Sequence, residues 1–240
     1  MRSMALARRN LKEICLDPLG ILLAVGLPAV LLVVFNPIAR VESFFSPTNL
    51  APGIALFGFA MLSLSSGMIL ARDRDSAFLS RLLTAPLRAS DFITAYSIPY
   101  LPVAIIQIAV VFGIGALLGL QMAGNAGLVF LVLMVMSVGY LGLGMILGLL
   151  FSYKTVSIAW IVVNLLTVFG GAWFSLEVMG TGFQNVMNLL PFAHAIDAAR
   201  NIMLNGEGFT TIATDFYWVL GYTVVFFGLG VFLFRRRMTA

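Results

Sequence analysis

Residues 127–153 read GLVFLVLMVMSVGYLGLGMILGLLFSY, and no Asp, Glu, Lys, Arg or His interrupts them. A helix needs roughly 20 mostly apolar residues to cross the hydrocarbon core of a bilayer. A helix that is apolar on every side belongs in a membrane or in the core of a large protein. This stretch therefore predicts a membrane-spanning helix.

The rest of the chain repeats this pattern. Its 240 residues are 61% hydrophobic and only 10% charged, whereas about 25% of the residues in a soluble domain are charged. Six stretches of spanning length lack ionisable side chains, and they cover residues 19–38, 50–71, 92–120, 127–153, 155–176 and 216–234. The sequence predicts an all-α membrane protein with six transmembrane helices in a single domain, residues 1–240.

The positive charges predict the orientation of these spans. Twelve of the 14 Lys and Arg residues fall on one side of them, and only Arg40 and Arg200 fall on the other. Because Lys and Arg are retained on the cytoplasmic side, both termini are predicted to be cytoplasmic. The net charge of +4 then reports topology, and no nucleic acid is expected as a partner. The first span is predicted to be an uncleaved anchor.

Residues 1–18 are predicted to form an amphipathic helix at the cytoplasmic interface. Its apolar residues recur at helical spacing, and they are Met4, Ala7, Leu11, Ile14 and Cys15. Asp17-Pro18 is predicted to end this helix, because the residue before a proline disfavours helical geometry. Two roles remain open for it: lying on the membrane surface, or contacting a cytoplasmic partner.

The second cytoplasmic connection, residues 72–91, contains another short predicted helix. Its apolar residues share one face, and they are Phe78, Leu79, Leu82 and Leu83. Charged residues precede this face, and Ala85-Pro86 ends it. A solvated linker has no need of an apolar face. The helix is therefore predicted either to dock on a soluble partner or to lie against the bilayer surface.

The longest connection, residues 177–215, is predicted to lie on the outer side. It contains an amphipathic helix whose apolar face is formed by Phe192, Ala195, Ile196, Ala199, Ile202 and Met203. His194, Asp197 and Arg200 fall on other faces, and Asp197 and Arg200 are spaced for an i,i+3 ion pair. The segment is predicted to be re-entrant, dipping into the outer leaflet where other parts of the protein cover its backbone.

Several kinds of chemistry are disfavoured by what the sequence contains. The six spans have no ionisable residues, which ion-coupled transporters use to bind the coupling ion. The nearest approach to a nucleotide-binding loop, GLLFSYKT at residues 148–155, has Tyr153 where glycine is required. His194 is the only histidine, and no nucleophile motif surrounds Ser175. We expect no catalytic residue, metal or bound cofactor in this chain.

The cytoplasmic stretch DRDSAFLSRLLTAP, residues 73–86, resembles a segment of the type 2 membrane permeases of ABC transporters. That family has an ERERGTLERLLATP-like sequence with the same spacing. The matching positions are Asp73, Arg74, Asp75, Leu79, Arg81, Leu82, Leu83 and Pro86, and the main departures are Ser76, Ala77, Phe78 and Ser80. The resemblance extends over nearly the whole chain, including Gly26-Leu27-Pro28, Ala51-Pro52-Gly53-Ile54 and Leu190-Pro191.

The resemblance implies the transmembrane half of an exporter in a bacterial or archaeal cytoplasmic membrane. Its partners would be membrane lipids, a second permease copy (identical or closely related) and a cytoplasmic ATP-binding subunit, which would hold ATP and Mg and carry out the hydrolysis. The short helix would be a coupling helix. The residues expected to couple to the ATPase are Asp73, Arg74, Asp75, Phe78, Leu79, Arg81, Leu82, Leu83 and Pro86.

By the same resemblance, the second and fifth spans would line the transport path. The candidate residues are Ser63, Ser65, Ser66, Asn164, Thr167, Phe169, Trp173 and Phe174. Ordinary packing between helices is an alternative role for each of them. An uncharged path would suit a hydrophobic or amphipathic small molecule or a lipid. The alternatives are a lipid-linked glycan or sodium as the substrate, or a non-transporting sensor docked to an ATPase.

Overall fold

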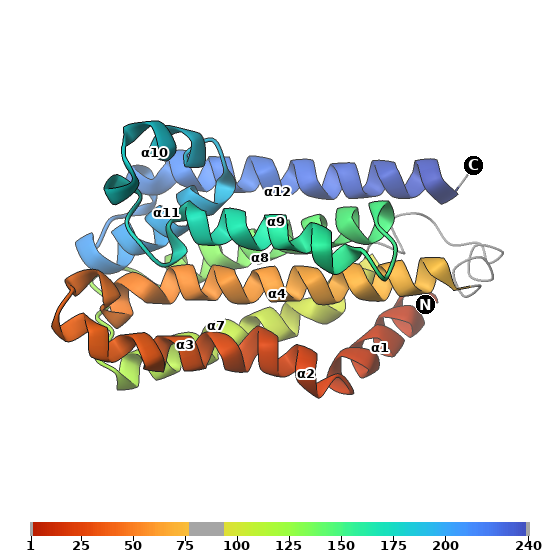
Figure 1. Cartoon of the computed structure of the whole chain (residues 1–240), viewed down its shortest axis with the longest axis horizontal. Coiled ribbons are helices and arrows are strands. Elements are labelled where there is room, and N and C mark those ends of the chain that lie inside the picture. The colour runs from red at the N-terminus through yellow and green to blue at the C-terminus, as the bar shows by residue number, and fades with distance from the viewer. Residues whose placement is uncertain (1, 77–93, 239–240) are drawn as a thin grey trace.

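The computed structural model of the protein describes residues 2–76 and 94–238 (Figure 1). These residues form helices joined by turns, and no strand occurs among them. The prediction of an all-α membrane protein is confirmed. The long helices run side by side along one axis, while the first helix lies at an angle to them (Figure 1).

The amphipathic helix α1 (Arg2–Cys15) ends two residues before Asp17-Pro18, where the chain changes direction. Asp17 then caps the next helix, because its side chain accepts a hydrogen bond from the backbone N–H of Gly20 at 2.9 Å. The first span, Pro18–Arg40, follows without interruption. It consists of α2 (Pro18–Ile21), the π-helical turns η1 (Leu22–Gly26), α3 (Leu27–Phe35) and η2 (Asn36–Arg40).

Five helices in the described part of the chain are long and apolar enough to cross a membrane. Besides the first span, they are α4 (Pro47–Asp75), the helix Thr94–Leu117 containing η4 (Ile98–Tyr100) and α7 (Leu101–Leu117), α8 (Ala126–Leu150), and Phe209–Arg236 within α12 (Phe209–Met238). The last of these begins seven residues before the predicted start at 216.

The predicted fifth span is shorter than the others. It is the apolar helix Val156–Ala172, formed by α9 (Val156–Thr167) and the π-helical η5 (Val168–Ala172). Gly171, one residue before its end, breaks the helical geometry with φ +94°, a backbone conformation that residues other than glycine rarely adopt. The chain then turns through η6 (Leu176–Met179) and α10 (Thr181–Met187) into α11 (Pro191–Asn205).

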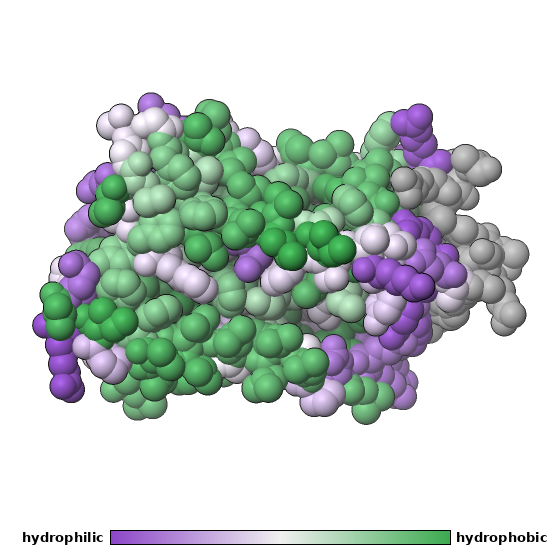
Figure 2. All heavy atoms as spheres, viewed as in Figure 1, coloured by the Kyte–Doolittle hydropathy of each residue, from purple (hydrophilic) through white to green (hydrophobic). Residues whose placement is uncertain are grey.

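Helices α4 and α8 form the centre of the bundle, and small residues let them approach closely. A Cβ atom added at Gly144 would lie 2.1 Å from Ser66 Oγ, and one added at Gly148 would lie 2.6 Å from the Gly67 carbonyl oxygen. Close backbone approach at small residues is how helices associate in membranes. The first span and α12 are exposed along most of their length, and hydrophobic side chains cover the middle of the visible surface (Figure 2).

Gln107 is a buried polar residue within the third span, and it was not among the predicted site residues. Its Nε2 donates to the Ala55 carbonyl oxygen of α4 at 2.8 Å. The amide occupies the space that a side chain at Gly58 would fill, since a Cβ there would lie 2.0 Å from Nε2. A polar side chain in a bilayer needs such a partner, so Gln107 fixes the third span against α4.

Candidate functional site

Polar side chains gather at the end of the bundle that carries α1 and the last turn of α4 (Figure 2). Three residues of the recognised motif, Asp73, Arg74 and Asp75, lie in this turn. The predicted connection begins at Arg72, whereas helix α4 continues through Asp75. Their side chains hydrogen-bond to neighbouring elements, and these bonds stabilise the last turn of the helix.

The Asp73 carboxylate is buried, with 3% of its side chain exposed, and three hydrogen bonds satisfy it. Arg9 of α1 donates to both oxygens, from Nη1 at 2.6 Å and from Nη2 at 2.9 Å. Tyr96, at the start of the third span, donates its hydroxyl proton at 2.6 Å. These bonds and the charge of Asp73 raise the pKa of the Arg9 guanidinium. Burying a carboxylate is costly unless it is paired in this way.

Glu13 extends this arrangement along α1. It accepts from Arg9 Nη2 at 2.7 Å, an i,i+4 pair on the same helix, and its second oxygen accepts from Arg72 of α4. We call Arg9, Glu13, Arg72, Asp73 and Tyr96 the basal network. It connects α1 to the end of α4 and to the beginning of the third span.

Arg74 and Asp75 connect the same turn of α4 to the loop between α8 and α9. Arg74 donates to the carbonyl oxygens of Leu149 and Phe151, the latter at 2.9 Å. Asp75 accepts from the backbone N–H of Tyr153 at 2.8 Å. The three motif residues therefore contact three different parts of the chain. Asp73 contacts α1 and the third span, while Arg74 and Asp75 contact the end of α8 and the loop that follows it.

The other predicted coupling residues lie in residues 77–93, outside the described part of the chain, and they are Phe78, Leu79, Arg81, Leu82, Leu83 and Pro86. Both flanks of this segment are described. Asp73 lies on one flank and Tyr96 on the other, and they are hydrogen-bonded to each other. Tyr96 was not among the predicted residues, and neither was Asn10, whose Nδ2 donates to the Ala95 carbonyl oxygen at 3.0 Å. Tyr96 could have been predicted, because it lies near the start of the apolar stretch 92–120, where tyrosine is common at a membrane interface.

The predicted path residues are not all in one place. Ser63 and Ser66 are buried and donate to backbone carbonyl oxygens of α4 itself, on the face against α8. Thr167 is buried and lies 2.6 Å from the Tyr140 hydroxyl of α8. Ser65 contacts the Tyr100 hydroxyl at 3.1 Å and borders a cavity. Asn164 Oδ1 is buried with no hydrogen-bond partner in the described structure. Their role in transport stays a prediction.

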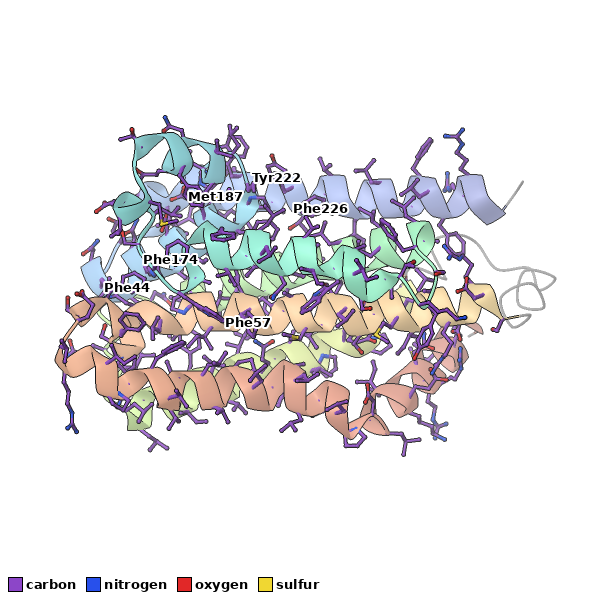
Figure 3. All side chains as sticks on the ribbon, viewed as in Figure 1. Phe44, Phe57, Phe174, Met187, Tyr222 and Phe226 are labelled. Carbon is purple, nitrogen blue, oxygen red and sulfur yellow. The ribbon has the colours of Figure 1, made fainter. Side chains whose placement is uncertain are left out.

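The three predicted aromatic path residues lie near the opposite end of the bundle. Trp173 packs on Phe57 of α4, with ring centroids 5.2 Å apart, and on Phe35 of the first span at 6.0 Å. Phe169 packs on Phe174 at 6.2 Å. Figure 3 shows Phe57 and Phe174 in the half of the bundle that carries α10 and α11. Among the described residues, Trp173 Nε1 is buried and has no hydrogen-bond partner.

Arg200 fixes α11 against this aromatic end. Only 9% of the residue is exposed. Its guanidinium donates to the carbonyl oxygens of Asn49 and Gly171, both at 2.8 Å, and lies 5.0 Å from the centre of the Phe44 ring. The predicted ion pair with Asp197 is wrong, because no such pair forms within 4 Å among the described residues. Arg200 instead satisfies the carbonyl that the break at Gly171 leaves unpaired.

His194 lies on α11 between two acceptors. Its Nδ1 is 2.6 Å from Asp215 Oδ1, and its Nε2 is 2.8 Å from the Asn188 carbonyl oxygen. The ring stacks on Trp218 of α12. A charged imidazolium satisfies both acceptors, whereas the neutral ring has one N–H. Burial lowers the pKa of His194, but the bonds to Asp215 and Asn188 outweigh burial and raise it above its ordinary value.

Replacing Arg9 with Met should leave the Asp73 carboxylate buried without its cation. We expect Arg9→Met to lower the free energy of unfolding by about 3 kcal/mol, as for other broken buried ion pairs. The measurement is thermal unfolding of the purified protein in detergent. Arg8→Met removes an exposed charge from the same helix and serves as the control. Adding Asp73→Asn to Arg9→Met should restore part of the loss. Equal effects of the two arginine variants would contradict the role assigned to the basal network.

The His194–Asp215 pair should make stability depend on pH. Because folding raises the pKa of His194, its contribution is fully present below about pH 6.5, the ordinary value, and is lost as the pH rises through the folded value. We expect the difference in Tm between wild type and His194→Gln to be largest near pH 5.5 and to shrink by pH 8.5. His194 is the only histidine, so no other histidine contributes to the pH dependence of this difference. A difference that does not change with pH would rule out the charged pair.

Comparison with known proteins agrees with the fold. Residues 2–204 match the family profile described as "ABC-2 type transporter". The chain is 29% identical over 227 residues to "Putative transport permease ycf38" of Porphyra purpurea, a match that covers 89% of this chain and 78% of that protein. It is 23% identical over 207 residues to "Probable multidrug ABC transporter permease YbhR" of Escherichia coli strain K12, covering 85% of this chain and 55% of that protein.

A longer relative is "ABC transporter G family member 20" of Dictyostelium discoideum, which is 29% identical over 199 residues. The match covers 78% of this chain but 27% of that protein, so the chain spans about a quarter of this relative and about half of the E. coli one. The family match covers most of the chain, and the apolar helices provide its multiple membrane crossings. The chain is thus a multi-pass membrane protein and belongs to the ABC-2 type transporter family.

Proposed function

We propose that this chain is the transmembrane subunit of an ATP-driven exporter, and that residues 77–93 dock on a separate cytoplasmic ATP-binding subunit. The observation that carries the proposal is the basal network. It connects both flanks of this segment to each other through Asp73 and Tyr96, and to α1 through Arg9. A force applied to the segment would therefore reach three helices together.

Helix α4 is suited to transmit such a movement through the membrane. It is a continuous helix of 29 residues, Pro47–Asp75, and most of it is buried within the bundle. One end carries Asp73, and the other is bound through the Asn49 carbonyl oxygen to Arg200 of α11. Because packed interiors deform little, a displacement of one end of α4 would also move the other end.

The arrangement of the two ends supports the orientation expected from the charges. Helix α1 and the C-terminal part of α12 lie at the same end of the bundle, and α10 and α11 lie at the opposite end (Figure 1). Arg8, Arg72, Arg235 and Arg236 belong to the first end. By the positive-inside rule, this end faces the cytoplasm of a bacterial or archaeal cell in our proposal.

A second permease copy has a suitable face on α9. Four apolar residues at helical spacing are between 46% and 66% exposed, and they are Ile158, Ile161, Val162 and Leu165. This stripe lies on the apolar helix Val156–Ala172. In the proposed exporter a second copy, identical or closely related, packs here, and membrane lipids cover the first span and α12.

The proposed substrate is a hydrophobic or amphipathic small molecule or lipid, moved out of the cell. The interior of the bundle supports this class, because its buried polar side chains include hydroxyls and amides such as those of Ser63, Gln107 and Thr167. ATP and Mg would be bound by the partner subunit, and this chain would supply the passage.

Changing Leu82 and Leu83 together to Asp should separate this chain from the ATP-binding subunit. We expect the wild-type protein to co-purify with that subunit in mild detergent and to carry a fluorescent amphiphilic dye into vesicles in an ATP-dependent manner. The double variant should lose at least nine-tenths of this transport, because charges would replace its apolar docking face. Val178→Asp, at an apolar residue that is 82% exposed at the other end, is the matched control.

Two results would contradict the proposal. One is a wild-type protein that purifies without any ATP-hydrolysing subunit and supports no ATP-dependent transport. The other is retention of full transport by the double variant.

A further inference from the structure

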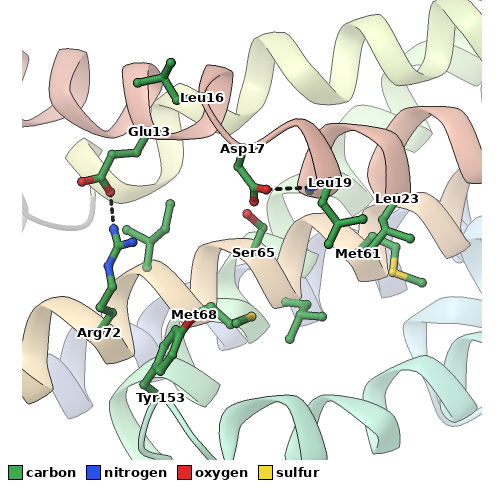
Figure 4. Close-up of a pocket in the computed structure, with 13 residues that line it drawn as sticks. Glu13, Leu16, Asp17, Leu19, Leu23, Met61, Ser65, Met68, Arg72 and Tyr153 are labelled. Carbon is green, nitrogen blue, oxygen red and sulfur yellow. Dashed lines mark hydrogen bonds and ion pairs between the residues drawn. The ribbon is translucent and has the colours of Figure 1, made fainter.

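A cavity of about 590 Å³ opens on the side of the bundle at the corner between α1 and α2. Its walls come from this corner, from the first span, from α4 and from Tyr153 of the α8–α9 loop (Figure 4). Sites for small organic ligands commonly have volumes of roughly 300–1,000 Å³. We call this cavity the corner pocket.

The polar end of the corner pocket carries one unbalanced negative charge. Glu13 and Arg72 both line it, but they are paired with each other, and Glu13 is also paired with Arg9. Asp17 lines the same end. Its hydrogen-bond partner is the backbone N–H of Gly20, and no cation among the described residues pairs with it.

The remainder of the corner pocket is mostly apolar. Leu19 and Leu23 of the first span face Met61 and Met68 of α4 across it (Figure 4). Methionine side chains are flexible and polarisable, so they adapt to apolar groups of different shapes. Ser65 lies near Asp17 in Figure 4 and adds a hydroxyl at the polar end. The pocket therefore places a carboxylate beside an apolar wall.

We propose that the corner pocket binds an amphiphilic organic cation, with the positive group beside Asp17 and the apolar part against Leu23, Met61 and Met68. If the bound cation is also the substrate of the exporter, the proposal rests on the proposed function, because the proposed orientation puts the pocket at the level of the inner leaflet. As a binding site it stands on the geometry alone.

Charge complementarity decides between the classes of occupant. An anion would be repelled by Asp17, and a neutral molecule would cover the carboxylate without replacing the water it loses, which is unfavourable. A cation replaces that water with an ion pair. Tyr153 lines the pocket and is 44% exposed overall, and its ring offers a second attractive surface to an organic cation.

The test uses two ions of the same shape and opposite charge, tetraphenylphosphonium and tetraphenylborate. Radiolabelled binding is measured on the purified protein in phosphatidylcholine nanodiscs, with empty nanodiscs subtracted and without any ATP-binding subunit. We expect saturable binding of the phosphonium, weakened by added salt, and no saturable binding of the borate. Saturable binding of both ions alike would overturn the proposal.

Asp17→Asn is the decisive variant, because asparagine caps a helix as well as aspartate does and removes only the charge. We expect it to weaken phosphonium binding about tenfold, on the order of the loss of one partly solvated ion pair. Glu177→Gln, which removes an exposed charge at the other end of the bundle, should leave binding unchanged. Met61→Trp should reduce binding by filling the apolar part. Unchanged affinity in Asp17→Asn would overturn the proposal.

This assay also separates the two proposals. Phosphonium binding that depends on Asp17 supports the corner pocket even if no ATP-driven transport is found. Conversely, ATP-driven transport with phosphonium binding that is indifferent to Asp17 supports the exporter and removes the pocket as its site for cations.

Discussion

The Asp73 carboxylate is buried at the end of the central helix α4, and a buried carboxylate must be neutralised and hydrogen-bonded. Arg9 meets the first need with two hydrogen bonds, and Tyr96 adds a third. This requirement fixes the positions of α1 and of the start of the third span. Since Arg74 holds the α8–α9 loop to the same turn, most of this end of the bundle is arranged around one turn of helix.

The opposite end depends on a similar constraint with the charge reversed. There the buried cation Arg200 is satisfied by the carbonyl oxygens of Asn49 and Gly171 and by the Phe44 ring. Between the two ends, contact is made by small residues and by Gln107. Polar groups thus fix the ends of α4, apolar packing fills its length, and the helix is suited to link events on the two sides of a membrane.

The helical class and the approximate spans could be predicted from the sequence, because the lengths of uncharged apolar stretches are set by the thickness of the bilayer. The family resemblance in residues 73–86 was also readable, and the match over residues 2–204 agrees with it. The partners of side chains that lie far apart in the sequence could not be predicted in this way. Asp197 has the local spacing to pair with Arg200, yet the arginine contacts Asn49, which is 151 residues away. The end of the fifth span at Gly171 likewise depends on a positive φ, which composition does not reveal.

The central claim is that one buried ion pair holds α1, the end of α4 and the start of the third span as a unit. Hydrogen–deuterium exchange of wild type, Arg8→Met and Arg9→Met in nanodiscs tests it most directly. The account predicts that Arg9→Met alone speeds amide exchange in α1, at residues 72–75 and at residues 94–97 together. Faster exchange confined to α1 would contradict it, because α1 would then be attached to the bundle without holding it together.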